Sequence, residues 1–131
     1  MQIPYLSNLE RSFELLKDHS LVAAGFCVKR SDGKILVVRE NNGAAMLPVA
    51  MLAERRGVDA AREALVAACG ADSPRGVFAQ TAVLTGIGAV IFYYTQAALL
   101  ESEPAGEWIS IKEVCEIDYQ KQVLEAFEVI R

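Results

Sequence analysis

The sequence predicts an α+β domain, arranged as an α/β/α sandwich rather than as a doubly wound nucleotide-binding fold. Two observations carry this prediction: an early pair of apolar segments flanks turn residues, and a segment with helical spacing separates that pair from later strand-like runs. The length of 131 residues fits one domain. We expect residues 1–20 to add an N-terminal helix to the domain that residues 21–131 form.

The first expected elements are that helix and a β-hairpin. Ser7 followed by Glu10 matches a capping box, in which each side chain bonds the other residue's backbone N–H at a helix start. The apolar runs Leu21–Arg30 and Ile35–Arg39 are typical of strands. Residues 31–34, Ser-Asp-Gly-Lys, favour a tight turn between them, since the glycine can take a positive φ.

The middle of the chain predicts a loop and a central helix. Residues 41–56 show no clean period and are expected to form a long loop. From Val58 the apolar residues recur at helical spacing, and Gly70 stands where a helix end favours a left-handed residue. One apolar face of this helix is predicted to contain Val58, Ala61, Leu65, Ala68 and Cys69.

The last third of the chain predicts three strands and a helix. Two strands, Val77–Leu84 and Ala89–Ala97, are expected to join around Thr85 and Gly86, and Trp108–Ile111 reads as a short strand. A C-terminal amphipathic helix is expected over Asp118–Arg131, with one apolar face formed by Val123, Phe127 and Ile130.

Composition excludes several classes of protein. A 53% apolar content excludes a disordered chain, and no apolar run reaches the roughly 18–20 residues of a membrane helix. The net charge of −4 argues against binding nucleic acid through a basic surface. The N-terminus lacks the uninterrupted apolar run of a secretory signal, so we expect a cytoplasmic protein. Its three cysteines, Cys27, Cys69 and Cys115, are expected to be free, buried thiols.

Several short motifs occur in a familiar order. Leu47-Pro48-Val49-Ala50 stands before the central helix, Ala60-Ala61 and Gly70 lie in and after it, and Glu107-Trp108 precedes a short turn. In this order the chain, from Leu21 to Ile130, resembles the Nudix hydrolase family. The resemblance implies an α/β/α sandwich with a mixed β-sheet. It also implies a relation to enzymes that cleave nucleoside diphosphate derivatives.

The chemistry of the family depends on a box, Gly-x5-Glu-x7-Arg-Glu-x2-Glu-Glu-x-Gly, whose helical glutamates hold Mg²⁺. Counted back from Gly70, the three glutamate positions are Ala64, Ala67 and Ala68. Counted from the Leu-Pro pair, they are Leu65, Ala68 and Cys69. Neither frame contains a carboxylate. We therefore expect no catalytic residue, no metal ligand and no cofactor at the usual place.

Displaced acids are the alternative. Glu54, Asp59 and Glu63 are the carboxylates near the helix, and Asp59 and Glu63 share one of its faces. If they held Mg²⁺, the protein would be a divergent hydrolase of a nucleoside diphosphate derivative; otherwise they form a solvated flank. In the frame counted from Gly70, Arg55 and Glu63 occupy the positions where the family has an acid and an arginine. The signs are exchanged, and one interpretation is that an ion pair between the loop and the helix is kept without catalysis.

Arg39 is the candidate for contact with a ligand, and only the resemblance supports it. Arg39 ends the second strand, where family members often place a cation near the substrate phosphate; the alternative is an exposed strand-end residue. His19, the single histidine, is expected at the surface. The favoured function is non-catalytic: binding a nucleotide-like or other small molecule, or acting as an interaction domain. A homodimer is also open, since family members often dimerise, and so is an unrelated α+β domain with a similar order of elements.

Overall fold

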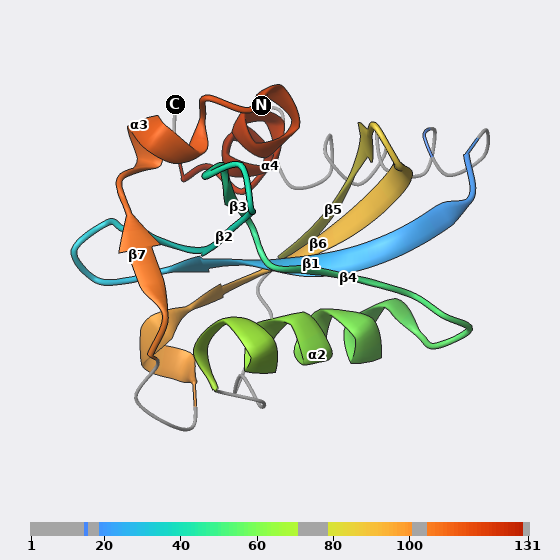
Figure 1. Ribbon diagram of the computed structural model, residues 1–131, viewed down its shortest axis with the longest axis horizontal. Coiled ribbons are helices and arrows are strands. Elements are labelled where there is room, and N and C mark those ends of the chain that lie inside the picture. Colours follow the sequence, from blue (N-terminus) through green and yellow to red (C-terminus); the bar gives the residue numbers. More distant parts are fainter. Residues whose placement is uncertain (1–14, 16–18, 71–78, 101–104, 130–131) are drawn as a thin grey trace, which may run out of the picture.

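The computed structural model describes residues 15, 19–70, 79–100 and 105–129. The helix expected after Ser7 lies outside the described residues. One β-sheet lies between helix α2 on one side and helices α3 and α4 on the other (Figure 1), so the predicted three-layer arrangement of an α+β domain is confirmed. No helix within the described ranges is long and apolar enough to cross a lipid bilayer.

The sheet contains seven strands and is mixed. The strand order is β3-β2-β1-β6-β5, with β4 pairing with β1 and β7 pairing with β2; β1 and β6 are parallel and the other pairs are antiparallel. The elements are β1 (Leu21–Lys29), β2 (Ile35–Arg39), β3 (Ala45–Met46), β4 (Val49–Met51), α2 (Gly57–Cys69), β5 (Ala79–Thr85), β6 (Gly88–Gln96), the 3₁₀ turn η1 (Ala97–Leu99), β7 (Glu107–Ile109), α3 (Ile111–Val114) and α4 (Asp118–Ala126).

Strand β1 is where the sheet forks. One of its edges pairs with β6 from Leu21 to Lys29. Its other edge is shared, because β4 pairs with the first half of the strand and β2 pairs with its end. At the fork the chain passes so close to Gly25 that a Cβ there would collide with the carbonyl oxygen of Pro48. Glycine at this position therefore allows the approach that starts β4.

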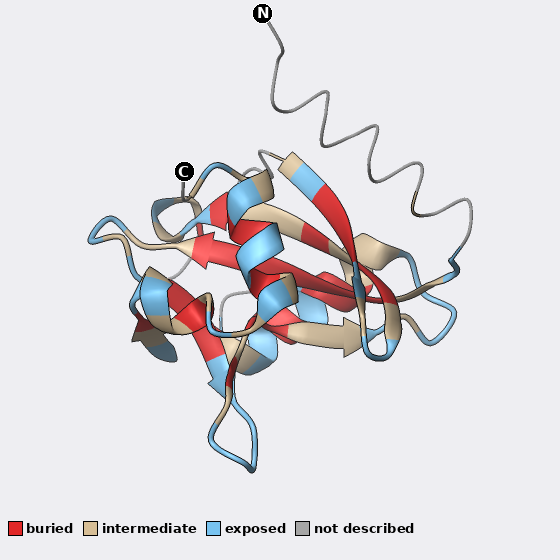
Figure 2. Ribbon diagram, turned by 90° about the horizontal axis from the view of Figure 1, so that it is seen from above, coloured by how far each residue is buried: buried red, intermediate tan, exposed pale blue. Residues whose placement is uncertain are grey.

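Buried residues fill both sides of the sheet (Figure 2). On the α2 side, Leu65 of the helix belongs to the same cluster as Phe26 of β1. On the opposite side, Val123 and Leu124 of α4 share a cluster with Phe92 of β6. Two apolar layers, one on each face, account for the helices that cover both faces of the sheet.

The hairpin and the central helix agree with the sequence prediction. Strand β2 has the predicted bounds, and Gly33 in the turn has a φ of 86°. Strand β1 ends one residue earlier than predicted, because the N–H of Arg30 bonds the carbonyl of Lys34 in the turn. Helix α2 ends at Cys69, and Gly70, with a φ of 80°, donates its N–H to the carbonyl of Val66 as a left-handed C-cap.

The expectation of a structureless loop over residues 41–56 is wrong. That segment contains β3 and β4, which pair with β2 and β1. Strands of two and three residues are too short to show the alternation by which strands are found in a sequence. Strand β3 is ordered by a short hairpin with β2, and β4 is ordered by β1, which precedes that hairpin in the chain.

The strand expected to reach Ile111 is shorter than predicted. Strand β7 ends at Ile109, because Ser110 caps α3 and its hydroxyl accepts a bond from the N–H of Glu113 at 3.4 Å. Ser110 followed three residues later by Glu113 has the spacing of a capping box, so the sequence does carry this signal.

The last helix is also shorter than predicted. Helix α4 ends at Ala126, and Glu128 takes a φ of 58°. The N–H groups of Glu128 and Val129 bond the carbonyls of Glu125 and Leu124, which is the hydrogen-bond pattern of a Schellman motif. Because a glutamate stands at the usual glycine position, the sequence hides this stop. Residues 130–131 lie outside the described part.

The three cysteines are free, as predicted. Cys27 and Cys69 are buried, whereas Cys115 is half-buried, so the expectation of full burial holds for two of them. Burial raises the pKa of the Cys27 thiol to about 12, because the core disfavours the thiolate. Cys27 is thus a packing residue.

Candidate ligand-binding site

A cleft of about 510 Å³ opens where β4 separates from the rest of the sheet. This volume lies in the range of small-molecule sites. Helix α2, strands β2 to β4, the β5–β6 turn and helix α4 all contribute to it. The described lining residues are Val38, Glu40, Met46, Leu47, Pro48, Val49, Met51, Ala64, Ala67, Thr85, Gly86, Ile87, Val90, Phe92 and Tyr119.

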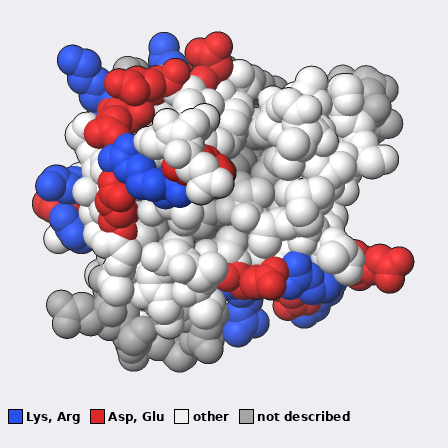
Figure 3. Space-filling view, in the orientation of Figure 1, with Lys and Arg blue, Asp and Glu red and all other residues white. Residues whose placement is uncertain are grey.

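The cleft is mainly apolar, and so is its rim. Val38, Met51 and Ile87 line it and keep 42%, 55% and 61% of their surface exposed, although large apolar side chains normally bury more. Figure 3 shows that the middle of this face, between charged groups at its two ends, carries mostly uncharged side chains. An apolar opening of this kind is typical of a binding surface.

Gln120 fixes one wall of the cleft. Its side chain is fully buried; its Oε1 accepts from the N–H of Leu47 at 2.8 Å, and its Nε2 donates to the carbonyls of Ala45 at 3.1 Å and Val114 at 3.0 Å. The amide therefore joins α4 to β3 and to the segment before Pro48. The role of Gln120 could not be predicted from the sequence, because a single glutamine on a helix gives no sign that it is buried.

The partly exposed ring of Tyr119, backed by the fully buried ring of Phe92, forms the floor of the cleft. The rings of Phe92 and Tyr119 stack with centroids 6.3 Å apart and planes at 26°. The pKa of Tyr119 is raised, first by burial and then by the negative charge of Glu40, so that carboxylate lies within electrostatic reach of the phenol. Glu40 is the only charged residue among the described residues of the lining.

The structure distinguishes the two possible frames of the box. Ala64 and Ala67 line the cleft, whereas Leu65 and Cys69 are buried against the sheet. The frame counted from Gly70 is therefore the one that faces the cleft, although its third position, Ala68, packs against the α2 core. The methyl groups at 64 and 67 offer no oxygen ligand, so the residues present do not fit the Mg²⁺ that the fold family implies.

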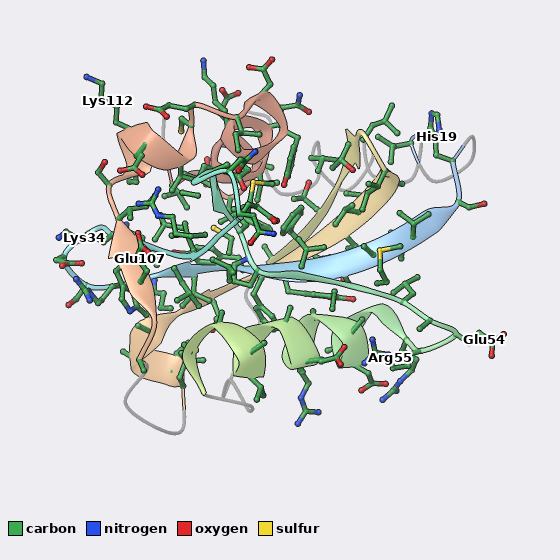
Figure 4. All side chains as sticks on the ribbon, viewed as in Figure 1. His19, Lys34, Glu54, Arg55, Glu107 and Lys112 are labelled. Atoms are coloured by element: carbon green, nitrogen blue, oxygen red, sulfur yellow. The ribbon has the colours of Figure 1, made fainter. Side chains whose placement is uncertain are left out.

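The displaced acids stand elsewhere. Glu54, Asp59 and Glu63 are all outside the described lining of the cleft. Asp59 pairs with Arg56 at 3.0 Å, and that hydrogen bond is the main cause of its lowered pKa. Glu54 points outward from the turn before α2 (Figure 4). Within the described ranges, no three His, Cys, Asp or Glu side chains gather where they could hold a metal ion.

An ion pair joins the turn before α2 to the helix. Arg55 Nη2 lies 2.7 Å from Glu63 Oε2. Figure 4 shows Arg55 lying against the first turns of α2. The exchanged signs thus retain a bridge between these two positions.

Arg39 is engaged in a surface ion cluster. Its Nη2 lies 2.6 Å from Glu107 and 2.9 Å from Glu113, and its Nη1 donates to the carbonyl of Gly43. Arg39 is not among the described residues of the cleft, and its contact with a ligand stays a prediction. His19 is exposed just before β1, on the side of the sheet away from α2 (Figure 4).

Sequence analysis also missed the side chains that give the cleft its character. Glu40 follows the end of β2, Tyr119 lies in α4 and Ile87 lies in the β5–β6 turn. No local pattern joins these three positions, since the topology alone brings them together. The one available signal was Ile87, an apolar residue between two turn glycines.

No description of a known protein family matches the chain, and no curated protein matches it. Solved structures do. One, from work on MutT of the fish pathogen Aliivibrio salmonicida and of Vibrio cholerae, has a TM-score of 0.55 and 16% identity, covering 82% of this chain and 93% of that chain. The MutT protein of Methanosarcina mazei Go1 has a TM-score of 0.51 and 12% identity, covering 82% and 94%.

The chain has a Nudix-type fold. At these identities the likeness concerns the fold alone. Within this Nudix-type fold, the cleft lies against helix α2.

Proposed function

We propose that this Nudix-type domain binds a small molecule in the cleft and does not hydrolyse diphosphates. One observation carries the proposal: the two box positions that face the cleft, 64 and 67, are alanines. Metal ions stabilise a transition state by several kcal/mol, and each 1.36 kcal/mol is a factor of ten in rate. A cleft that cannot hold the ion still keeps its shape and its apolar walls.

The alternative, a divergent hydrolase using Glu54, Asp59 and Glu63, gains no support from the geometry. None of these acids belongs to the described lining, and two of them are already paired with arginines. The proposed ligand is nucleotide-like in size, because the cleft volume suits a drug-sized molecule. The proposed setting is the cytoplasm, supported by the three free cysteines.

Hydrolysis is the first test. The wild-type protein is incubated with a panel of nucleoside diphosphate derivatives and Mg²⁺ or Mn²⁺, and the products are measured by mass spectrometry. We expect no turnover above the rate without protein. Robust metal-dependent hydrolysis that Glu63→Gln abolishes would show that the protein is an enzyme and would overturn the proposal.

A gain-of-ligand variant sharpens this test. Ala64→Glu combined with Ala67→Glu returns carboxylates to the cleft, whereas a glutamate at Ala68 would press into the core. We expect weak Mg²⁺ binding by calorimetry and little turnover, because Val49 and Ala50 replace the family's flexible glycines. Turnover restored to the level of an efficient enzyme would contradict the importance given to that loop.

Binding is the second test, followed by NMR chemical-shift changes with adenosine, tryptophol and tryptamine as probes. Ala67→Phe should block the cleft, because Ala67 lines it, and Val66→Phe on the outer face of α2 is the matched control. We expect at least one probe to shift cleft resonances in the wild type and in Val66→Phe, but not in Ala67→Phe. Failure of all three probes would overturn a binding function.

A further inference from the structure

We propose that the cleft selects organic cations, specifically small molecules that carry a protonated amine on an apolar aromatic body. The inference rests on the proposed binding function and adds to it the chemical class of the ligand. Three features of the lining support it: the apolar walls, the Tyr119 ring at the floor and Glu40, the one charged residue among the described lining residues.

The apolar walls would take the body of the ligand. Tyr119 presents a partly exposed ring to the cleft, and the fully buried ring of Phe92 stacks behind it. Aromatic rings pair favourably with other rings when these are offset or tilted. The exposed rim residues Met51 and Ile87 would lose their contact with water when such a ring enters.

The charge of Glu40 would select the amine. Within the described residues its carboxylate has no hydrogen bond or ion pair, and neither lysine nor arginine lines the cleft. The neighbouring cation, Arg39, is directed to Glu107 and Glu113 and so does not neutralise Glu40. An incoming ammonium group could therefore pair with the Glu40 carboxylate, which has no ion-pair partner among the described residues and acts electrostatically on the Tyr119 phenol.

The same arrangement works against phosphates. A phosphate or carboxylate in the cleft would meet the negative charge of Glu40, and the described lining offers no cation to offset it. Specificity of this kind comes from repulsion of the wrong ligand as much as from attraction of the right one. The ligand class thus differs in charge from the diphosphates that the resemblance suggested.

A matched series of indoles tests the inference. Tryptamine is cationic, tryptophol is neutral and indole-3-acetate is anionic, and all three carry the same ring. Their dissociation constants are measured by NMR titration at low ionic strength for the wild type, for Glu40→Gln and for Glu116→Gln. Glu116 is an exposed glutamate outside the described lining, so it serves as the control.

For the wild type and Glu116→Gln, we expect tryptamine to bind about three- to fivefold more tightly than tryptophol, and indole-3-acetate to bind most weakly. In Glu40→Gln the three constants should converge, and added salt should produce the same convergence in the wild type. Equal binding of the three probes by the wild type, or an order unchanged by Glu40→Gln, would overturn the inference while leaving the binding function standing. If none of the three indoles binds while adenosine still shifts cleft resonances, the inference alone is overturned; if adenosine also fails to bind, both proposals are overturned.

Discussion

Arg55 joins the turn before α2 to the helix itself through Glu63. The Nη2 atom of Arg55 lies 2.7 Å from Glu63 Oε2 and also donates to the carbonyl of Met51 at 2.8 Å, while its Nε donates to the carbonyl of Leu52 at 3.1 Å. The turn between Leu52 and Arg55 contains two left-handed residues that are not glycine, with φ values of 47° at Ala53 and 68° at Glu54. One guanidinium therefore binds both the backbone of a strained turn and a side chain of the helix.

Arg55→Met should destabilise the protein more than Glu63→Gln. The pair is partly exposed, so losing Glu63 should cost no more than about 1 kcal/mol, whereas losing Arg55 also removes its bonds to two carbonyls and should cost about 1–2 kcal/mol. Urea unfolding of both single variants and of the double variant gives the coupling energy. A coupling energy of zero would show that the pair contributes nothing to stability.

Leu65→Ala should lower the free energy of unfolding by roughly 2–5 kcal/mol, because the side chain is fully buried between α2 and the sheet. The control is Val66→Ala on the next residue, whose side chain keeps 43% of its surface exposed. We expect that change to stay within about 0.5–1 kcal/mol. Similar losses for both variants, measured by urea denaturation, would mean that the two faces of the helix have been confused.

Gln120→Met should cost about 2–4 kcal/mol, since it leaves the Leu47 N–H and two carbonyls without their buried partner. Gln122→Met, an exposed glutamine on the same helix, should be nearly neutral. Thermal unfolding followed by circular dichroism compares the two. An equal loss of stability at both positions would show that Gln120 does not hold the cleft wall in place.

The Asp32 carboxylate should make the free energy of unfolding depend on pH in the acid range. The hydrogen bond from Arg30, followed by that from the Lys34 N–H, lowers the pKa of Asp32 to about 2. Because the folded pKa lies below the unfolded one of about 3.9, this stabilisation is present above pH 4 and is lost as the pH falls towards 2. Stability curves of wild type and Asp32→Asn should therefore converge in that range. An NMR titration midpoint of Asp32 near 3.9 would contradict the shift.

The elements built from local signals were predictable. Gly33 and Gly70 have the positive φ angles that their neighbours in sequence suggested, and Leu65 lies on the predicted buried face. The pairing of Arg55 with Glu63 is consistent with one interpretation of these two positions. In each case the residues that decide the structure lie within one hairpin, one helix, or a helix and its preceding turn.

What the sequence concealed depends on distant partners. Strand β4 is ordered by its pairing with Ala23 to Gly25 of β1. The exposed side chain of Ile87 can be recognised as part of a cleft only when β4 and α2 are known to lie beside it. The stop of α4 at Glu128 has no glycine to announce it. The environment of Gln120 is likewise set by Leu47, which is 73 residues away along the chain. Features of this kind can be predicted only once the order and pairing of the strands and helices are known.

The position of the cleft at the β1 fork and the chemistry of its lining depend on different groups of the protein. The opening beside Gly25 is held by main-chain hydrogen bonds between β1 and β4 and by the carbonyl of Pro48, which bonds the N–H of Phe26. The character of what enters is decided by side chains such as Ala64 and Glu40, which take no part in that pairing. The backbone pairing sets where the cleft opens, whereas Glu40 sets the charge inside it, so Glu40→Gln should change the ligand preference without moving β4.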